Sequence, residues 1–174
     1  HTDMLIETGI LADTSRIWWD LRPSARYPTL ETRVMDSCTS LEDSVRLAAL
    51  NLCLMRKLYR LRRDNQQWRP YPELLIGENR WRAMRYSCDP GLLDRGRQRI
   101  VAFAQLVDDI IELLREDAIE LGCLPEIAGL RNILERGTSA HRQLRIFERA
   151  LQSGADQQEA FSTVVDWLVA ETAR

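Results

Sequence analysis

Residues that favour β-strand are confined to the chain before Ser40, and this constrains the fold more than any other feature. Ile17 to Arg22 and Thr29 to Met35 have strand character, and a turn-rich segment from Pro23 to Pro28 separates them. Beyond Ser40 the sequence reads as one helix after another. We therefore expect an α+β fold, with about two antiparallel strands at the N-terminal end followed by a mostly helical array. Because two strands do not form a stable sheet by themselves, they should pair with another chain or lie against the helices.

Capping residues and glycine breaks mark the helical part. Ser40 and Asp43 form a capping box, and Pro72 can open a second helix. An apolar stripe with helical spacing follows Ser40, and it consists of Val45, Ala48, Ala49, Leu52, Met55 and Tyr59. Asp156 is placed to cap the last helix. We expect the later helices at Gln98 to Leu121, Glu126 to Arg136, Ser139 to Gln152 and Gln157 to Ala173.

The composition excludes several classes of protein. The 174 residues suffice for one domain, and a net charge of −2 gives no general attraction to nucleic acid or acidic membranes. No apolar run approaches the roughly 20 residues of a membrane helix. The four cysteines are far apart and form no CxxC pair, which favours a reduced environment over structural disulfides or zinc. We therefore expect a cytoplasmic protein that binds neither nucleic acid nor membrane.

Two charge clusters in the helical part are better explained by solvated helix faces than by ligand binding. Arginines from Arg56 to Arg69 lie among aromatic residues, but most of them fall in the last turns of a helix, where its dipole favours cations. Asp108, Glu112, Glu116 and Glu120 recur every four residues. A di-metal site of the ferritin-like kind needs Glu-x-x-His pairs, which this sequence lacks.

Glu31 and Arg33 lie two residues apart in the second predicted strand. Side chains alternate between the two faces of a strand, so this carboxylate and this guanidinium project into the same space. Such a pair suits the binding of a metal ion and a phosphate side by side. It is equally typical of an ordinary exposed sheet face, so the spacing alone leaves both interpretations open.

Longer stretches of sequence distinguish between these two interpretations of Glu31 and Arg33. They are Ile17 to Pro23, Pro28 to Asp36, Leu41 to Asp43, Glu78 to Arg85, Arg136 to Gln143 and Val164 to Thr172. In these stretches the chain resembles bacterial carboxylate–amine ligases of the glutamate–cysteine ligase type 2 family. The resemblance covers essentially the whole chain, but only the C-terminal half of the family's catalytic unit. It implies a glutamine-synthetase-like catalytic fold, in which residues 1–36 supply active-site strands and residues 37–174 the helical part of one domain.

The resemblance also implies a reaction. The family uses ATP and Mg²⁺ to convert a glutamate-like carboxylate into an acyl phosphate, which an amino acid or another amine then attacks, as in glutathione-type biosynthesis. Glu31 matches a metal-binding glutamate, and Arg33 matches the arginine that stabilises the transferring phosphate. Arg22, Asn79 and Arg82 would bind substrate or nucleotide. The N-terminal half would be a required partner that supplies the other metal ligands, so we expect the chain by itself to be inactive.

Several alternatives stay open at this stage. Arg22 could simply form a surface pair with Asp20, and Asn79, Arg82 and Arg85 could form a solvated helix face. His141 stands where the family usually has an acidic residue, and a helix-start role fits it better than that of a catalytic base. The chain could also be a non-catalytic helical interaction or regulatory module derived from the ligase. The sequence leaves a homo-oligomer open as well.

Overall fold

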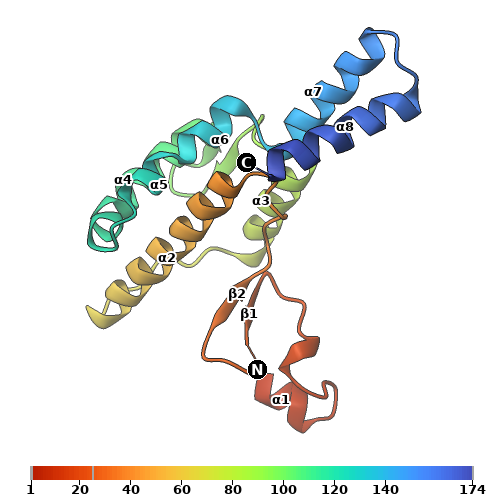
Figure 1. Ribbon diagram of the computed structural model, residues 1–174. Helices are drawn as coiled ribbons and strands as arrows, with labels where there is room; N and C mark the ends of the chain where they lie inside the picture. The colour runs from red at the N-terminus through yellow and green to blue at the C-terminus, as the bar shows by residue number, and fades with distance from the viewer. Residues whose placement is uncertain (1, 25, 174) are drawn as a thin grey trace. The chain divides into compact units, whose positions relative to one another are not determined.

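The computed structural model describes residues 2–24 and 26–173, and the chain divides into two compact units, His1–Ser37 and Cys38–Arg174. The first unit contains helix α1 (Thr2–Glu7), the 3₁₀ helix η1 (Thr14–Arg16) and strands β1 (Leu21–Pro23) and β2 (Leu30–Thr32) (Figure 1). The strands pair antiparallel, as predicted. They are shorter than the predicted Ile17 to Arg22 and Thr29 to Met35.

Pairing in this hairpin places Arg22 directly opposite Glu31. One further backbone hydrogen bond extends the ladder at each end, from Arg33 N–H to Asp20 O and from Ser24 N–H to Thr29 O. Pro23 has no N–H to donate, which limits how far β1 can continue. At the other end of β1, the predicted strand residues 17–20 lie outside the strand, although Asp20 O accepts the hydrogen bond from Arg33.

The second unit is mostly helical and holds a second hairpin that the sequence did not predict. Its elements are α2 (Leu41–Arg63), α3 (Glu73–Tyr86), β3 (Leu92–Asp94), β4 (Arg99–Val101), α4 (Phe103–Glu120), α5 (Leu124–Ala128), α6 (Leu130–Arg136), α7 (Ser139–Gln152) and α8 (Gln157–Thr172). The expected fold class, α+β with antiparallel strands and a helical array, is confirmed. None of the described helices is both long and apolar enough to span a membrane.

Two predicted helix boundaries were wrong. The helix expected from Gln98 begins at Phe103, because Arg99–Val101 pair with Leu92–Asp94 instead. The helix expected from Glu126 to Arg136 is two helices that meet at Gly129. A side chain at Gly129 would collide with the guanidinium of Arg46, since a Cβ there would lie 2.6 Å from Arg46 Nε.

The predicted cap at Asp156 is confirmed, and the one at Ser40 is confirmed in part. Ser40 Oγ accepts a hydrogen bond from Asp43 N–H at 3.5 Å, but the Asp43 carboxylate accepts from Arg46 and Arg136 and does not complete the predicted capping box. Asp156 forms a full capping box with Glu159, and a second capping box joins Thr138 and His141 at the start of α7, so His141 is a helix-start residue. Each cap satisfies backbone N–H groups that the first helical turn leaves unpaired.

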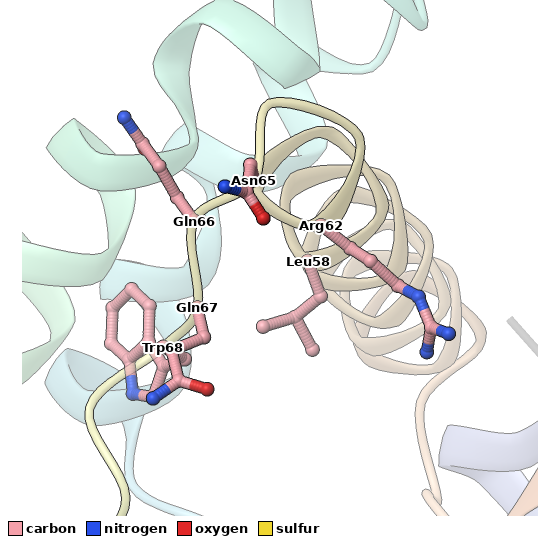
Figure 2. A pocket seen from close by; sticks show the side chains of 6 residues that line it. All are labelled: Leu58, Arg62, Asn65, Gln66, Gln67 and Trp68. Carbon is pink, nitrogen blue, oxygen red and sulfur yellow. The ribbon is translucent and has the colours of Figure 1, made fainter.

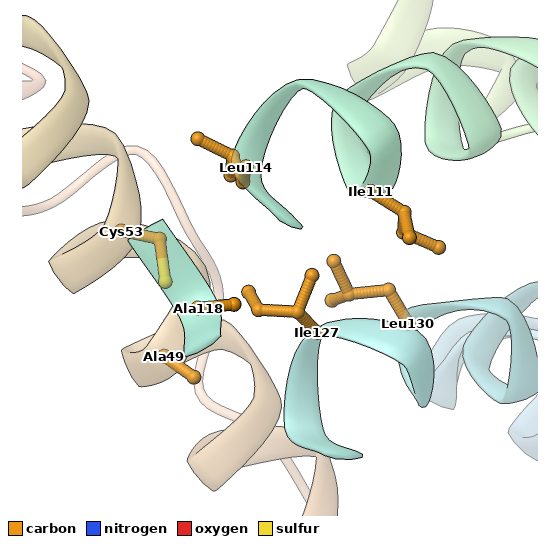
Figure 3. Close-up of a cluster of buried hydrophobic side chains, with 7 residues drawn as sticks. All are labelled: Ala49, Cys53, Ile111, Leu114, Ala118, Ile127 and Leu130. Carbon is orange, nitrogen blue, oxygen red and sulfur yellow. The ribbon is translucent and has the colours of Figure 1, made fainter. Parts of the chain in front are cut away.

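The core of the second unit lies where α2 meets α4, α5 and α6. Figure 3 shows its buried side chains, which are Ala49, Cys53, Ile111, Leu114, Ala118, Ile127 and Leu130. Burying a leucine side chain fully stabilises a fold by about 1.5–3 kcal/mol, and Leu114 has no exposed surface. Of the predicted stripe on α2, Ala49 alone is buried, whereas Val45, Leu52, Met55 and Tyr59 are exposed.

Candidate functional site

Glu31 forms the centre of a small charged cluster on the β1–β2 hairpin. Its Oε2 accepts a hydrogen bond from Arg22 Nη2, and its Oε1 accepts one from Arg33 Nη1 at 2.5 Å. The hydrogen bond from Arg22 holds the pKa of Glu31 below its usual value, so the carboxylate is charged at neutral pH. With one carboxylate and two guanidinium groups, the cluster carries a net charge of about +1 and can accept an anion such as a phosphate.

Two further contacts position the arginines. The Cζ of Arg33 lies 4.9 Å from the ring centroid of Trp18, which is a cation–π distance. Arg22 Nη1 donates to Ser15 O at 3.2 Å and thereby ties η1 to the hairpin. The side chain of Glu31 is 44% exposed, so the cluster is open to a ligand.

The role of Glu31 as one ligand of Mg²⁺ stays a prediction. Mg²⁺ prefers hard oxygen donors, and the exposed Glu31 carboxylate provides them, while both of its oxygens also accept hydrogen bonds from Arg22 and Arg33. Among residues 2–24 and 26–173, no group of three or more His, Cys, Asp or Glu side chains is placed to hold a metal ion.

Asn79 and Arg82 lie in the second unit and contact the β3–β4 hairpin. Asn79 Nδ2 donates to Leu93 O at 2.9 Å, and Asn79 Oδ1 accepts from Leu93 N–H at 2.8 Å. Arg82 Nε lies 3.4 Å from Gly91 O, to which it donates, and Arg82 Nη1 lies 4.0 Å from Glu78. These contacts hold the unpredicted hairpin on α3. A substrate-binding role for either residue stays a prediction.

We expect Asn79→Ala to destabilise the chain by about 1–3 kcal/mol, because it leaves the half-buried backbone groups of Leu93 without their partner. Urea unfolding measures the change. Asn132→Ala, at an exposed position on α6, is the matched control and should cost less than about 0.5 kcal/mol. Equal losses in the two variants would contradict the role of Asn79 in the hairpin.

The charged residues of α2 and α4 pair with one another. Arg60 forms two hydrogen bonds of 2.7 Å with Glu116, and both Arg56 and Arg60 bond Asp117. Arg56 also approaches Glu120 at 3.5 Å. These ion pairs engage Arg56 and Arg60 of the basic cluster, which supports the helix-face interpretation over nucleic-acid binding for these two residues. They likewise account for two of the four acidic residues spaced along α4.

The hollow at the C-terminal end of α2 contains none of the predicted site residues. It has a volume of about 430 Å³ and is lined by Leu58, Arg62, Asn65, Gln66, Gln67 and Trp68. The indole of Trp68 and the side chain of Leu58 lie on two sides of it (Figure 2). Its neutral amides and open shape give no acid, base or nucleophile for chemistry.

Three of the stretches that carry the family resemblance meet in the second unit. Arg136 donates to Asp43 at 2.5 Å, and Arg142 donates to Glu171 at 2.5 Å while it stacks over Trp167 at 4.6 Å. A hollow of about 330 Å³ opens beside these pairs. Sequence reasoning assigned no role to Arg136, Arg142 or Glu171, although each lies in one of those stretches. The first pair joins the end of α6 to the start of α2, and the second joins the first turns of α7 to the end of α8.

Comparison with known families decides the identity of the chain. The sequence profile of glutamate-cysteine ligase family 2 (GCS2) matches residues 1–166. The chain belongs to this family. Among similar glutamate–cysteine ligase family 2 proteins is one from Rhodospirillum rubrum, 53% identical over 172 residues, which cover 99% of this chain and 44% of the relative.

Two further relatives also match nearly all of this chain with less than half of their own length. A protein of Paracoccus denitrificans is 49% identical over 99% of this chain and 46% of its own length. One from Sorangium cellulosum is 40% identical over 98% of this chain and 44% of its own length. All three are provisionally named glutamate–cysteine ligase 2. This ligase-family chain thus spans less than half the length of the curated relatives it matches.

Proposed function

We propose that this chain is the C-terminal part of an ATP-dependent carboxylate–amine ligase with a glutamine-synthetase-like catalytic fold. The enzyme joins a glutamate-like carboxylate to an amino acid or another amine through an acyl phosphate. Family membership supports the ligase class. The observation that carries the site is the exposed cluster of Arg22, Glu31 and Arg33, in which two guanidinium groups share one carboxylate.

Each residue of the cluster has a separate task in this proposal. Arg33 faces the γ-phosphate and stabilises the negative charge that grows as the phosphoryl group transfers. Arg22 holds the nucleotide or the substrate carboxylate through its planar guanidinium. Glu31 holds both arginines in place and is one ligand of Mg²⁺. The bound ion would neutralise phosphate charge, so that a second anion can approach.

Exposed apolar side chains support the proposal that this part packs against more protein. Leu74 and Met84 on α3 and Val169 on α8 are each well over half exposed. Large exposed apolar patches usually mark interaction surfaces. The missing half of the catalytic domain is the expected partner, and a homo-oligomer is compatible with the same surfaces.

The test is Glu31→Gln in the full-length protein, assayed by ATP hydrolysis with glutamate and a panel of amines. We expect the rate to fall about 10²-fold and the Mg²⁺ requirement to rise, because an amide oxygen is a weaker ligand than a carboxylate. The 174-residue chain, assayed beside it, should show no turnover.

Glu7→Gln, at an exposed position on α1, is the matched control and should leave the rate unchanged. A Glu31→Gln enzyme with normal rate would refute the metal assignment. If the variant has a raised KM for ATP with an unchanged Mg²⁺ dependence, Glu31 positions the arginines without binding the ion.

A further inference from the structure

Two cysteine thiols that are far apart in the sequence meet in the core of the second unit. Cys53 lies in α2, and Cys123 lies at the turn between α4 and α5. Their Sγ atoms are 3.5 Å apart, and both are free thiols. Sequence spacing gave no reason to pair them. This proximity is a consequence of how α2 packs on α4 and α5.

The two sulfur atoms must approach each other further to form a bond. A disulfide needs an Sγ–Sγ distance of about 2.05 Å, so the gap must close by about 1.5 Å. Cys53 is a member of the buried core cluster, and Cys123 packs against that cluster. The approach therefore joins two side chains that are already neighbours.

The two thiols differ in how far a reagent can reach them. Cys53 has no exposed surface, whereas Cys123 is partly exposed. Burial raises the pKa of the Cys53 thiol to about 12, so this thiol stays protonated at neutral pH. Cys123 is therefore the thiol that a small oxidant meets first, and Cys53 is the thiol that can resolve the product.

We propose that Cys53 and Cys123 form a peroxide-sensitive modification site, which closes to a disulfide between α2 and the α4–α5 turn. The Cys123 thiol gives its proton to solvent, and its sulfur attacks hydrogen peroxide, so that an S–O bond forms and the O–O bond breaks. The departing hydroxide takes a proton back from solvent and leaves as the first water. Cys53 Sγ then attacks the sulfenic sulfur. The S–S bond forms, the S–O bond breaks, and the departing hydroxide takes the Cys53 proton as a second water. The thiols lose two electrons and the peroxide gains them.

The experiment uses the chain with Cys38→Ser and Cys88→Ser, so that only this pair remains. After treatment with hydrogen peroxide, the protein is denatured, alkylated, digested with trypsin and analysed by mass spectrometry. We expect a cross-linked peptide that joins residues 47–56 to residues 116–131, and its loss on treatment with dithiothreitol. Oxidation should also raise Tm by about 5–10 °C, because the bond constrains the unfolded chain.

Two single variants in the same background complete the test. Cys123→Ser and Cys53→Ala should each abolish the cross-linked peptide and the rise in Tm. The first of them changes a partly exposed position. The proposal is overturned if both thiols of the oxidised parent remain open to alkylation. It is equally overturned if Cys123 accumulates as a sulfinic acid without any cross-link. Neither outcome bears on the ligase proposal, which does not use these cysteines.

Discussion

Replacing Asp117 by alanine is expected to destabilise the helical unit by about 3–5 kcal/mol, because it removes the charge-assisted hydrogen bonds that Arg56 and Arg60 make to a buried carboxylate. Asp117 has no exposed surface. Its Oδ1 accepts from Arg56 Nη1 at 2.9 Å, and its Oδ2 accepts from Arg60 Nη2 at 3.0 Å. Since both arginines come from α2, the carboxylate joins α2 to α4. Urea unfolding, followed by circular dichroism, measures the loss.

Glu116→Gln is the matched control. Glu116 also pairs with Arg60, but its side chain is 67% exposed, and exposed ion pairs contribute about 0–1 kcal/mol. Asp117→Asn separates charge from volume, since it keeps the shape and removes the charge. If Asp117→Ala costs no more than Glu116→Gln, the buried ion pairs do not stabilise the contact between α2 and α4.

Asp117 also makes the stability of the fold depend on pH in the acid range. Burial raises the pKa of Asp117, but hydrogen bonds from Arg60 and Arg56 outweigh it and hold the pKa below its usual value. A carboxyl whose pKa is lower in the folded state stabilises the fold above its unfolded pKa, which is about 3.9. The stability difference between the parent and Asp117→Asn should therefore stay constant above about pH 5 and shrink as the pH falls below about 4.

Replacing Arg33 by alanine in the full-length enzyme is expected to lower kcat by about 10²–10³-fold, if the ligase proposal is correct. The reason is that the phosphoryl charge stabilised by this guanidinium develops mainly in the transition state. The KM for ATP should change much less. Steady-state kinetics with saturating glutamate and amine measure both quantities.

Arg33→Lys and Arg26→Ala are the controls for this prediction. Lysine keeps the charge but lacks the planar guanidinium that bonds Glu31 and stacks on Trp18, so it should restore only part of the rate. Arg26 is an exposed arginine in the same unit and should be dispensable. Equal kcat values for Arg33→Ala and Arg26→Ala would remove Arg33 from the proposed mechanism.

Local sequence signals predicted much of the fold. The bounds of α7 were read correctly from Ser139 and Gln152, and the cap hydrogen bonds at Ser40 and Asp156 are confirmed, because capping depends on side chains within three residues of each other. The β3–β4 hairpin was missed for the opposite reason. It depends on the side chain of Asn79, which bonds the backbone of Leu93 fourteen residues later.

In the candidate site, too, contacts between residues close in sequence were predicted and contacts between distant residues were not. Alternation along one strand placed Glu31 and Arg33 together, and the structure adds Arg22 as the direct cross-strand neighbour of Glu31. The pairs Arg136–Asp43 and Arg142–Glu171 could not be read from spacing, because their members lie 93 and 29 residues apart. Periodicity identified an apolar stripe on α2, of which Ala49 alone is buried, because periodicity does not say which face meets a neighbour.

The β3–β4 hairpin also explains why position 91 tolerates no side chain. Gly91 has φ +70°, and a Cβ there would lie 2.1 Å from the carbonyl oxygen of Val101. Any other residue would push Val101 away, and Ala102, the residue just before α4, would move with it. The position at which α4 begins thus depends on a glycine eleven residues before Ala102.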